Sequence, residues 1–568
     1  MSDAGVRKAQ PVVPGEDEAL PRGAWLGLGI VLLAAFMELL DVTVVTVADP
    51  QIQQSLHASY AQIEWIIAGY QLAFAAGLVT GGRLGDIYGY RRMFVIGVLW
   101  FTVASLLCGL APNGTAIVIF RMLQGLGAAI MFPQVVSIIH TTFVGRHRAP
   151  AFGALGAVTG LAGVVGPLLG GSLISLNILG ELWRPIFLIN IPIGLIAIFG
   201  ALSLVRESKS GEAPRLDLVG ACLGTIVLVL VLFPLIEGRA AGWAWWIWAM
   251  LALSLPALGT FLLDQRIRRR HGRWPVIDPT LFRGGAFGSG LVIQMLCFAG
   301  VSGVFLVLAV ELQEGHQFSA LSTGIAFLPI AVGTGLASGI AIPLLPRLGK
   351  VVLQLGAVVM ILGMLALMYT LRTYPETLSF WKLAPAEIIV GLGLGTIVTT
   401  VNDVVLAEAT GPSAGSGSGV QATMGQTGNA VGVAIIGAIF FGLLSGGAVG
   451  AASAQVPTFA AQMQQLAVPS ATAAALETDL TACFAGEASA ADPGKILAPC
   501  LAMTSTAASA HDPRLVTLVD STLTNTTRKH FSTSMATSLI YEIVVYLLVL
   551  LLVFLLPFRR GLQAGTAH

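Results

Sequence analysis

The chain has 568 residues, of which 55% are hydrophobic and only 10% are charged, and its mean hydropathy is +0.84. Soluble domains carry about 25% charged residues, so this composition excludes an ordinary water-soluble protein and indicates an all-α polytopic membrane protein. The net charge of +1 points to no charged partner, and we expect no nucleic acid to bind.

Apolar runs of about 20 residues, the length that crosses a bilayer, recur along the chain with short polar breaks. The first run is too long for a signal-peptide core, so we expect it to be retained as a span. The runs predict fourteen transmembrane helices near residues 24–48, 62–82, 93–111, 115–140, 149–175, 185–205, 217–236, 243–263, 286–311, 320–342, 351–371, 383–408, 419–445 and 534–557.

The distribution of Lys and Arg predicts the orientation. With both ends in the cytoplasm, the cytoplasmic segments hold 21 of the 30 basic residues, the outer loops hold eight, and Arg121 lies within a span. Cytoplasmic loops carry the excess of Lys and Arg. We therefore predict a multi-pass protein of the cytoplasmic membrane, with cytoplasmic tails at residues 1–23 and 558–568.

A faint internal repeat suggests two equivalent halves. Gly82-Arg83-Leu84-Gly85 ends the second span, and Pro346-Arg347-Leu348-Gly349 follows the tenth. We expect six-helix bundles at residues 24–205 and 284–557, joined by a linker, residues 206–283, that contains two inserted helices. Paired halves around a central cavity are a known plan of transporters.

A long outer loop at residues 446–533 is rich in Ala, Ser and Thr and contains Cys483 and Cys500. Two cysteines in one extracytoplasmic loop indicate a disulfide that staples a floppy loop, with redox or metal chemistry as the alternative. Asp512 followed by Pro513 has the pattern of a helix N-cap, so a helix is expected to start there and run towards the last span.

Acidic residues inside the first span are the main functional signal. Placing a carboxylate at the bilayer centre costs about 2.5–3.5 kcal/mol of insertion free energy, so such a residue needs a binding partner or has a functional role. Asp41 lies at a depth similar to that of Arg121 in the fourth span, so the two can pair. Glu38, one turn away, is interpreted as a second proton site or a recognition charge for cations. Asp49 is interpreted as a helix-end residue at the water boundary.

Four further acids lie in or near later spans. Asp403, about five residues inside the twelfth span, is predicted to be a second titratable site or a cation-attracting charge on the inner vestibule. Glu311 and Glu408 are placed at span ends, where water is close, and are interpreted as structural. Glu542 lies in the last span and is given no role.

Three stretches look like functional motifs, and each can also be explained by an ordinary structural role. Gly82, Asp86, Gly89, Arg91 and Arg92 lie between the second and third spans, where an ordinary basic turn is the alternative. Arg121 and Gln124 share one face of the fourth span, where an Arg that snorkels to the interface is the alternative. Small residues line the fifth span, where generic packing is the alternative; these are Gly163, Gly166, Pro167, Gly170 and Gly171.

Together these stretches resemble the major facilitator superfamily. The loop at 82–92 resembles its gate-latch signature, but Ile87 and Tyr90 stand where basic residues are usual. The Arg121 stretch resembles the span-four motif whose Arg is linked to proton transfer, and GVVGPLLGG resembles the antiporter signature. Residues 40–50, 183–194 and 415–442 resemble the fourteen-span drug:proton antiporters of the QacA/EmrB-like branch. The likeness omits only the tails and the long outer loop.

The resemblance implies a major facilitator fold that exports hydrophobic, cationic compounds in exchange for protons by alternating access. It implies that Asp41 and Arg121 handle protons or substrate charge, while Glu38 and Asp403 are expected to contribute from their own placement within the spans. The alternatives are a dedicated exporter of one metabolite, antibiotic or lipid, or a receptor or scaffold that does not transport. The sequence contains no Walker loop and no metal-spaced His cluster, so we expect no enzyme, cofactor or metal. The expected partners are the substrate, protons and the bilayer, and we expect a monomer.

Overall fold

The computed structural model describes residues 23–143, 147–177, 180, 183–209, 217–238, 241–273, 275–277, 282, 286–406, 414–489, 498–509 and 512–555. Within these ranges the chain forms helices and short turns, and no β-strand occurs. Fourteen helical stretches are long and apolar enough to cross a membrane, which confirms the predicted span count.

The N-terminal half consists of α1 (Ala24–Leu56), α2 (Tyr60–Tyr88), α3 (Tyr90–Gly109), α4 (Gly114–Thr142), α5 (Arg148–Leu176), α6 (Pro185–Leu188) and α7 (Asn190–Leu204). The inserted pair is α8 (Leu218–Glu237) and α9 (Trp245–Arg270). The C-terminal half consists of α10 (Ala286–Val310), the π-helical turn η4 (Glu311–Gly315), α11 (Ala320–Ala326), α12 (Leu328–Leu348), α13 (Lys350–Thr373), α14 (Phe380–Leu406), α15 (Ala414–Gln465) and α18 (Pro513–Leu555).

Local sequence signals account for many helix boundaries. Ser59 and Gln62 form a capping box at the start of α2, and Asn113 accepts a backbone N–H at the start of α4. Gly89 separates α2 from α3, and Gly349 separates α12 from α13, each with a positive φ that favours glycine. The helices can therefore follow one another with hardly any intervening loop.

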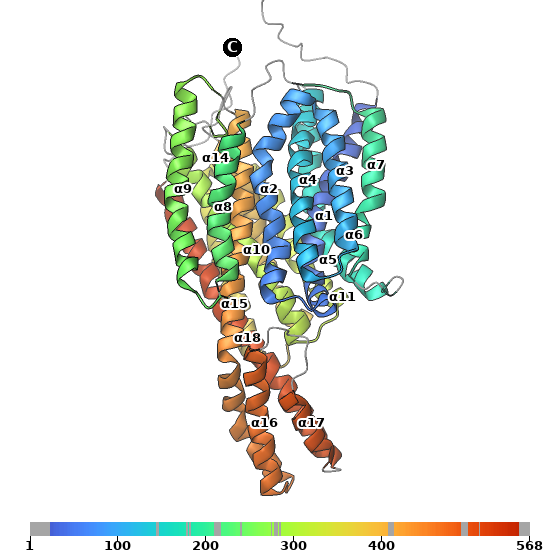
Figure 1. Cartoon of the computed structure of the whole chain (residues 1–568), viewed down its shortest axis with the longest axis vertical. Helices are drawn as coiled ribbons and strands as arrows, with labels where there is room; N and C mark the ends of the chain where they lie inside the picture. Colours follow the sequence, from blue (N-terminus) through green and yellow to red (C-terminus); the bar gives the residue numbers. More distant parts are fainter. Residues whose placement is uncertain are drawn as a thin grey trace, which may run out of the picture.

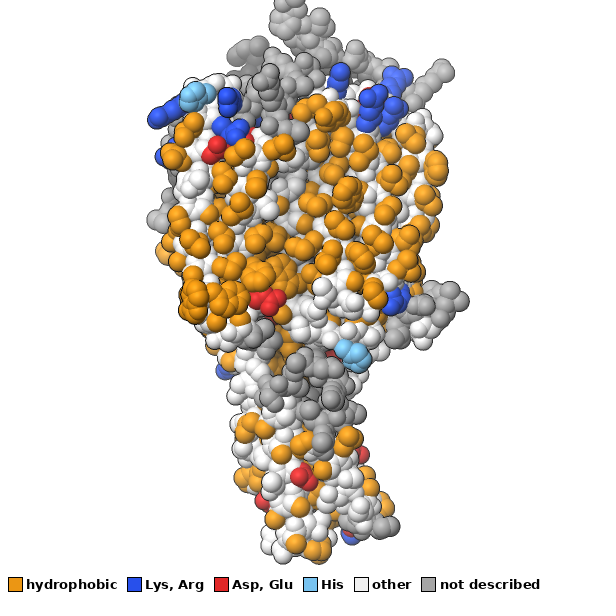
Figure 2. All heavy atoms as spheres, in the orientation of Figure 1, with side chains coloured by type: hydrophobic (Ala, Val, Ile, Leu, Met, Phe, Trp, Pro, Cys, Tyr) orange, Lys and Arg blue, Asp and Glu red, His pale blue; other side chains and the backbone are white. Residues whose placement is uncertain are grey.

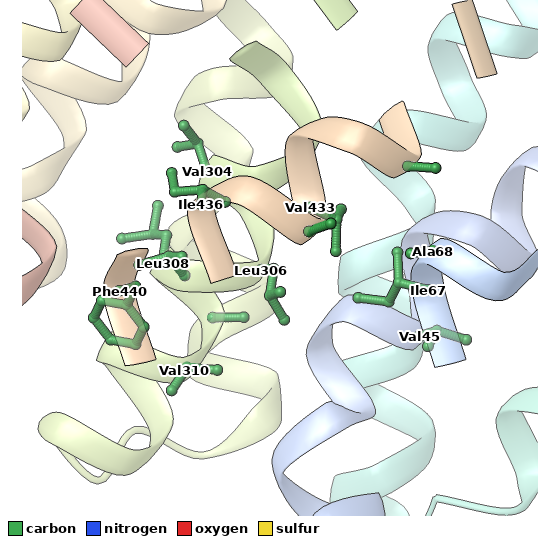
Figure 3. Close-up of a cluster of buried hydrophobic side chains, with 14 of the residues drawn as sticks. Val45, Ile67, Ala68, Val304, Leu306, Leu308, Val310, Val433, Ile436 and Phe440 are labelled. Carbon is green, nitrogen blue, oxygen red and sulfur yellow. The ribbon is translucent and has the colours of Figure 1, made fainter. Parts of the chain in front are cut away.

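The helices stand side by side with their axes along the length of the molecule (Figure 1). On the face shown in Figure 2, hydrophobic side chains cover the lateral wall of the bundle, while Lys and Arg gather at one end. Such a wall suits contact with lipid. One apolar cluster joins the halves: Val45 and Ile67 of α1 and α2 lie in it together with Val433 of α15 and Leu306 of α10 (Figure 3).

Residues 446–533 differ from the floppy loop that was expected, because their described part is helical. α15 and α18 continue beyond the bundle and pack there with α16 (Ser470–Ser489) and α17 (Ala498–Ser509) (Figure 1). We call this part the extension. Its core contains Phe459, Met463, Phe484 and Met503. Ala is the strongest helix former, so the Ala-rich composition suits helices as well as it suits a loop.

A disulfide joins Cys483 of α16 to Cys500 of α17. α18 begins at Pro513, and Asp512 accepts the backbone N–H of Arg514 over 2.9 Å. The cap inferred from the sequence is therefore present. The extension is a folded body with a cross-link and a core of its own, continuous with two helices of the C-terminal half.

Candidate functional site

The centre of the N-terminal half is a polar network around Asp41 of α1, whose side chain is fully buried. Nη1 of Arg121 in α4 donates to Oδ2 of Asp41 in a buried ion pair. Nε2 of Gln124 donates to Oδ1 of Asp41 over 2.8 Å, and its own Oε1 accepts from Arg121 over 2.7 Å. The pairing that similar depth made possible is thus present, with Gln124 bonded to both partners.

Arg121 has no route to the lipid interface, because only 1% of it is exposed. Its Nε donates to the backbone oxygen of Ile66 in α2 over 3.1 Å. Its guanidinium carbon lies 4.3 Å from the centroid of the Tyr70 ring, a favourable cation–π arrangement. The alternative of a snorkelling arginine is therefore wrong. Arg121 instead connects α4 to α1 and α2.

Asn190 completes the network, and sequence reasoning missed its role. As the first residue of α7, it donates through Nδ2 to Asp41 Oδ1 and to Ser105 Oγ, over 2.8 and 2.9 Å. Ser105 of α3 in turn donates to the backbone oxygen of Phe187. The sequence signal that could have revealed this role is the position of Asn190, a polar residue at the start of a strongly apolar helix. Asp41 thus receives donors from α4 and α7, and the network reaches α3.

Glu38 lies one turn before Asp41 and is 1% exposed. The Tyr70 hydroxyl donates to Glu38 Oε1 over 3.2 Å, while the same ring faces Arg121. When both acids are ionised, two negative charges share one buried guanidinium. One proton or one cationic group would balance the excess charge, and electrostatic interactions are strong in a medium of low dielectric constant.

The interpretation of Asp49 as a helix-end residue at the water boundary is wrong. α1 continues through Pro50 to Leu56, and Asp49 is 1% exposed with no hydrogen-bond partner on either carboxyl oxygen. Proline is tolerated within membrane helices because packed neighbours compensate for the lost backbone bond. The Asp-Pro pair therefore lies within the helix and does not mark its end.

The acids of the C-terminal half are less connected. The side chain of Asp403 and the whole of Glu408 lie outside the described residues, so their roles stay predictions. Glu542 is fully buried, and neither of its oxygens has a hydrogen-bond partner. Glu387 of α14 and Glu64 of α2 are also buried acids, and sequence reasoning overlooked both of them because they lie in long apolar runs.

Glu311 is fully buried in η4, although it was expected near water. Ser532 donates to its Oε1 over 2.6 Å, and His316 Nδ1 lies 3.3 Å from the same atom. Burial alone would lower the pKa of His316, but the hydrogen bond and charge of Glu311, together with the Pro375 carbonyl, raise it. These contacts join η4 to α18 and fit the structural role expected for Glu311.

The latch-like segment is the end of α2 and the start of α3. Asp86 lies in the last turns of α2, 3.6 Å from the Arg83 guanidinium. The Tyr90 hydroxyl donates to Asp86 over 3.0 Å. Tyr90 stands where the superfamily usually has a basic residue, so a neutral donor here takes the place of a charged one. The added methyl of an alanine at Gly82 would lie 3.7 Å from Pro133 of α4, an ordinary contact distance.

Glu207, which sequence reasoning did not select, holds the start of α3. Its carboxylate oxygens accept the backbone N–H groups of Arg91 and Arg92 over 3.1 and 3.2 Å. Both guanidinium groups lie within 4 Å of the same carboxylate. Gly89 has a φ of +104°, which favours glycine, and a Cβ there would also lie 2.5 Å from the Glu207 carboxylate. An acid at a helix N-terminus is favoured by the helix dipole.

The small residues of α5 fit closely against α1. A methyl group added at Gly166 would overlap the Thr43 side chain, and one added at Gly170 would lie 3.1 Å from the backbone oxygen of Val44. Gly163 is different, because no atom lies within 4 Å of the added position. The stripe therefore forms a close contact surface from Gly166 onwards, with room for a side chain only at Gly163.

The last residues of the same stripe contact the other half of the molecule. A methyl group at Gly171 would overlap the Ala320 carbonyl of α11, and one at Gly324 of α11 would overlap the Pro167 carbonyl. α5 and α11 thus meet backbone to backbone. The sequence motif carried no sign that its partner would be α11.

The end of α1 is joined to η4 at the same seam. Gln51 Nε2 donates to Gln313 Oε1 over 3.0 Å, and Gln313 Nε2 donates to the backbone oxygen of Val47 over 2.9 Å. Gln54 donates to Glu314 over 3.0 Å. We call the α1–η4, α5–α11 and α2–α15 contacts between the halves the extension-side seam, because they lie towards the extension.

Comparison with known proteins identifies the family of this chain. The protein-family model of the Major Facilitator Superfamily matches residues 31–433 of this chain. The chain is 39% identical over 424 residues to the probable actinorhodin transporter of Streptomyces coelicolor, with 74% of this chain and 73% of that protein covered. It is 30% identical over 420 residues to the multidrug resistance protein Stp of Mycobacterium tuberculosis, with 73% and 75% covered.

A solved structure shares the fold. A bacterial homolog of the human lysosomal transporter Spinster, in an inward-facing and unoccupied conformation, superposes with a TM-score of 0.56 at 17% identity, over 96% of this chain and 100% of that one. The chain is a transporter rather than an enzyme, and it belongs to the Major Facilitator Superfamily, among the fourteen-span drug exporters that its motifs resemble.

Proposed function

We propose that this transporter exports hydrophobic, cationic compounds across the cytoplasmic membrane in exchange for protons, and that Asp41 couples the two movements. One observation carries the proposal: a single buried carboxylate binds Arg121, Gln124 and Asn190 and so ties α1 to α4 and α7. The protonation state of this acid can control the arrangement of the three helices, because its charge decides whether the three contacts are favourable.

Protonation of Asp41 removes the charge that balances Arg121. A buried ion pair that loses one partner leaves the other charge uncompensated, which is strongly unfavourable. The network then favours a different arrangement of α1, α4 and α7. Deprotonation restores the arrangement described above. The cycle of Asp41 protonation would thus bias the two conformations of an alternating-access transporter.

Glu38 supplies the charge for substrate recognition. It lies beside Asp41 and Arg121, and the net negative charge of this group is balanced by either a proton or a cation. A carboxylate site cannot hold both comfortably, since they compete for the same charge. Proton entry and substrate exit are therefore alternatives at one site, which is the requirement for antiport.

We propose cytoplasmic termini for two reasons. Lys and Arg gather at the end of the bundle opposite to the extension, as Figure 2 shows, and cytoplasmic segments carry the basic excess. The extension then lies outside the cell, where a disulfide is stable. In this orientation the extension-side seam is the outer gate, closed here, and the conformation described is open or occluded towards the cytoplasm.

The test is transport by the purified protein in proteoliposomes. A pH gradient directed inward should drive a cationic dye in the export direction, and an ionophore that collapses the gradient should stop this movement. Transport that continues unchanged without the gradient would overturn the antiport. Leu362→Met on the exposed surface of α13 serves as a control for the effect of substitution as such.

The alternative function is export of one dedicated compound. The probable actinorhodin transporter favours this alternative, whereas the multidrug resistance protein Stp favours a broad range. A panel of dyes and antibiotics, tested in a strain that lacks its own efflux pumps, separates the two. Resistance to many unrelated cations supports the multidrug function, and resistance to one compound alone supports the dedicated exporter.

A further inference from the structure

The imidazole ring of His316, directly after η4, is buried among oxygen atoms. Its Nδ1 lies 3.3 Å from Oε1 of Glu311 and 3.4 Å from the backbone oxygen of the same residue. Its Nε2 lies 3.0 Å from the backbone oxygen of Pro375, in the turn between α13 and α14. The proposed coupling through Asp41 does not use this ring.

Both ring nitrogens of His316 therefore face hydrogen-bond acceptors. A neutral imidazole carries one N–H, so one of its nitrogens would point a lone pair at an oxygen, whereas the imidazolium donates from both nitrogens. Ser532 donates to the same Glu311 oxygen over 2.6 Å, which fits an ionised carboxylate. Burial alone would lower the pKa of His316, but the hydrogen bond and charge of Glu311 raise it above its usual value. These contacts favour the protonated ring.

Glu311 is the acid in contact with the ring, and the other charged or titratable groups of the surrounding elements are directed elsewhere or lie at the surface. α10 and α11, which pack against η4, contain no Asp, Glu, Lys, Arg or His. On α18, Arg528 donates to the backbone oxygen of Glu376, and His530 Nε2 lies 2.7 Å from the backbone oxygen of Leu444. The remaining groups are Glu314 of η4, Asp49 and His57 at the end of α1, Arg372 and Lys382 beside the turn after α13, and Lys529 of α18.

The π-helical turn η4 is held from two sides. On one side, Gln313 and Glu314 form the hydrogen bonds to α1 that belong to the extension-side seam. On the other side, Glu311 binds His316 and Ser532 within the C-terminal half. π-helical turns are rare and are frequent at functional sites. Since the turn spans only five residues, a change on one side is felt on the other.

We propose that His316 is a positioning residue of the outer gate: its protonated ring holds η4 in the shape that binds α1, and loss of the proton releases η4 and favours opening of the seam. The inference rests on the alternating access of the proposed function. A neutral ring leaves either the Glu311 side or the Pro375 carbonyl without its donor, which is unfavourable for a buried acceptor. η4 can then relax, and Gln313 and Glu314 leave their partners on α1.

The sign of the pH effect follows from the two states of the seam. In the closed seam the contacts with Glu311 raise the pKa of His316, whereas a ring released to water has the usual value of about 6.5. The closed state therefore binds the proton more tightly. Its stabilisation is complete below about pH 6.5 and is lost as the pH rises through the higher, closed-state pKa. For one proton, the ratio of closed to open molecules changes by at most about tenfold per pH unit.

The experiment measures the width of the outer gate in the full-length protein in lipid nanodiscs, where both faces of the membrane meet the same pH. Spin labels at Leu110→Cys and Val449→Cys report on the two halves, since both positions are exposed. Cys222, the exposed free cysteine, is replaced by Ser. Distances are recorded over a pH series that extends to both sides of the usual histidine pKa of about 6.5. We expect the closed population to fall as the pH rises.

Two variants test the pair from both sides, so that the failure of one to fold leaves the other as a test. His316→Gln cannot take up the proton, so its closed population should no longer change in the range above about pH 6.5. Glu311→Gln keeps the ring but removes the charge that raises its pKa, so its response should move to lower pH. His530→Gln is the matched control, because its ring faces the Leu444 carbonyl, and it should respond as the wild type does.

Three outcomes would overturn the inference. The first is a wild type whose distances do not change with pH. The second is a folded His316→Gln or Glu311→Gln variant whose response equals that of the wild type. The third is a response that disappears in His530→Gln, since the proton would then bind to the other histidine.

The outcome is separate from that of the transport assay. If the gate follows pH through His316 while proteoliposomes move no dye, the proposed function fails and the role of His316 stands. If dye is exported and His316→Gln keeps the wild-type response to pH, the role of His316 fails and the function stands.

Discussion

Replacement of Asp41 by Asn tests the central network most directly. The carboxylate accepts from Arg121, Gln124 and Asn190, and none of these side chains is more than 1% exposed. An amide offers one acceptor oxygen instead of two, and its NH₂ group would face one of the donors. We therefore expect Asp41→Asn to lose proton-coupled export and also to lose stability.

The magnitude follows from the burial of Arg121. Removing one partner of a buried ion pair costs about 3–5 kcal/mol, because the other charge remains uncompensated. That corresponds to a change of about 10²- to 10⁴-fold in the unfolding equilibrium. A typical stability of about 5–15 kcal/mol is as large as this loss or larger, so a reduced stability remains. The variant should fold, but with a clearly lower denaturation midpoint.

The assay combines denaturant unfolding with dye transport per folded molecule. The double variant Asp41→Asn with Arg121→Gln removes the lone charge, so it should recover most of the lost stability without recovering transport. If the double variant is no more stable than Asp41→Asn alone, the ion pair is not the source of the loss. Coupled transport by Asp41→Asn at the wild-type rate would refute the role of Asp41.

Three further predictions concern other contacts. Gly171→Val should overpack the contact between α5 and α11, which would cost about 1–3 kcal/mol of stability and reduce export. Gly163→Ala, with no atom within 4 Å of the added methyl, should export normally. Equal export by both variants would contradict a close α5–α11 contact. Tyr90→Phe removes a 3.0 Å hydrogen bond and should lower the unfolding free energy by about 0.5–1.5 kcal/mol, so an unchanged midpoint in denaturant would count against it. Cys483→Ser removes the disulfide to Cys500, 17 residues away, and should destabilise the extension by about 3 kcal/mol. Limited proteolysis should then cleave α16 and α17 faster than in the wild type. Cleavage at the wild-type rate would contradict the prediction.

The span count and the Asp41–Arg121 pair were predictable because both signals lie along the chain itself. A bilayer demands about 20 apolar residues per span, and a charge within such a run must find a partner. Opposite charges at similar depth in two spans are therefore natural partners. The disulfide between Cys483 and Cys500 followed from the same kind of local signal.

Other contacts depend on how distant segments come together, which the sequence alone does not reveal. Asn190 reaches Asp41 across 149 positions of sequence, and Glu207 reaches Arg91 across 116. Glu64 was overlooked because a single acid hardly changes the hydropathy of its run. Asp49 was misplaced because Pro50 was taken as the end of a helix that packing in fact extends.

The continuity of α15 gives the transporter a mechanical property. With 52 residues at 1.5 Å per residue, this helix is about 78 Å long, and residues 446–465 account for about 30 Å of it beyond the predicted span. A helix that packs within one half and continues beyond it, here past Pro457, tilts with that half. A rotation of about 15° would sweep the tip of a 30 Å arm through about 8 Å. A tilt of the C-terminal half would thus be passed through α15 to the extension as a displacement beyond the end of the bundle.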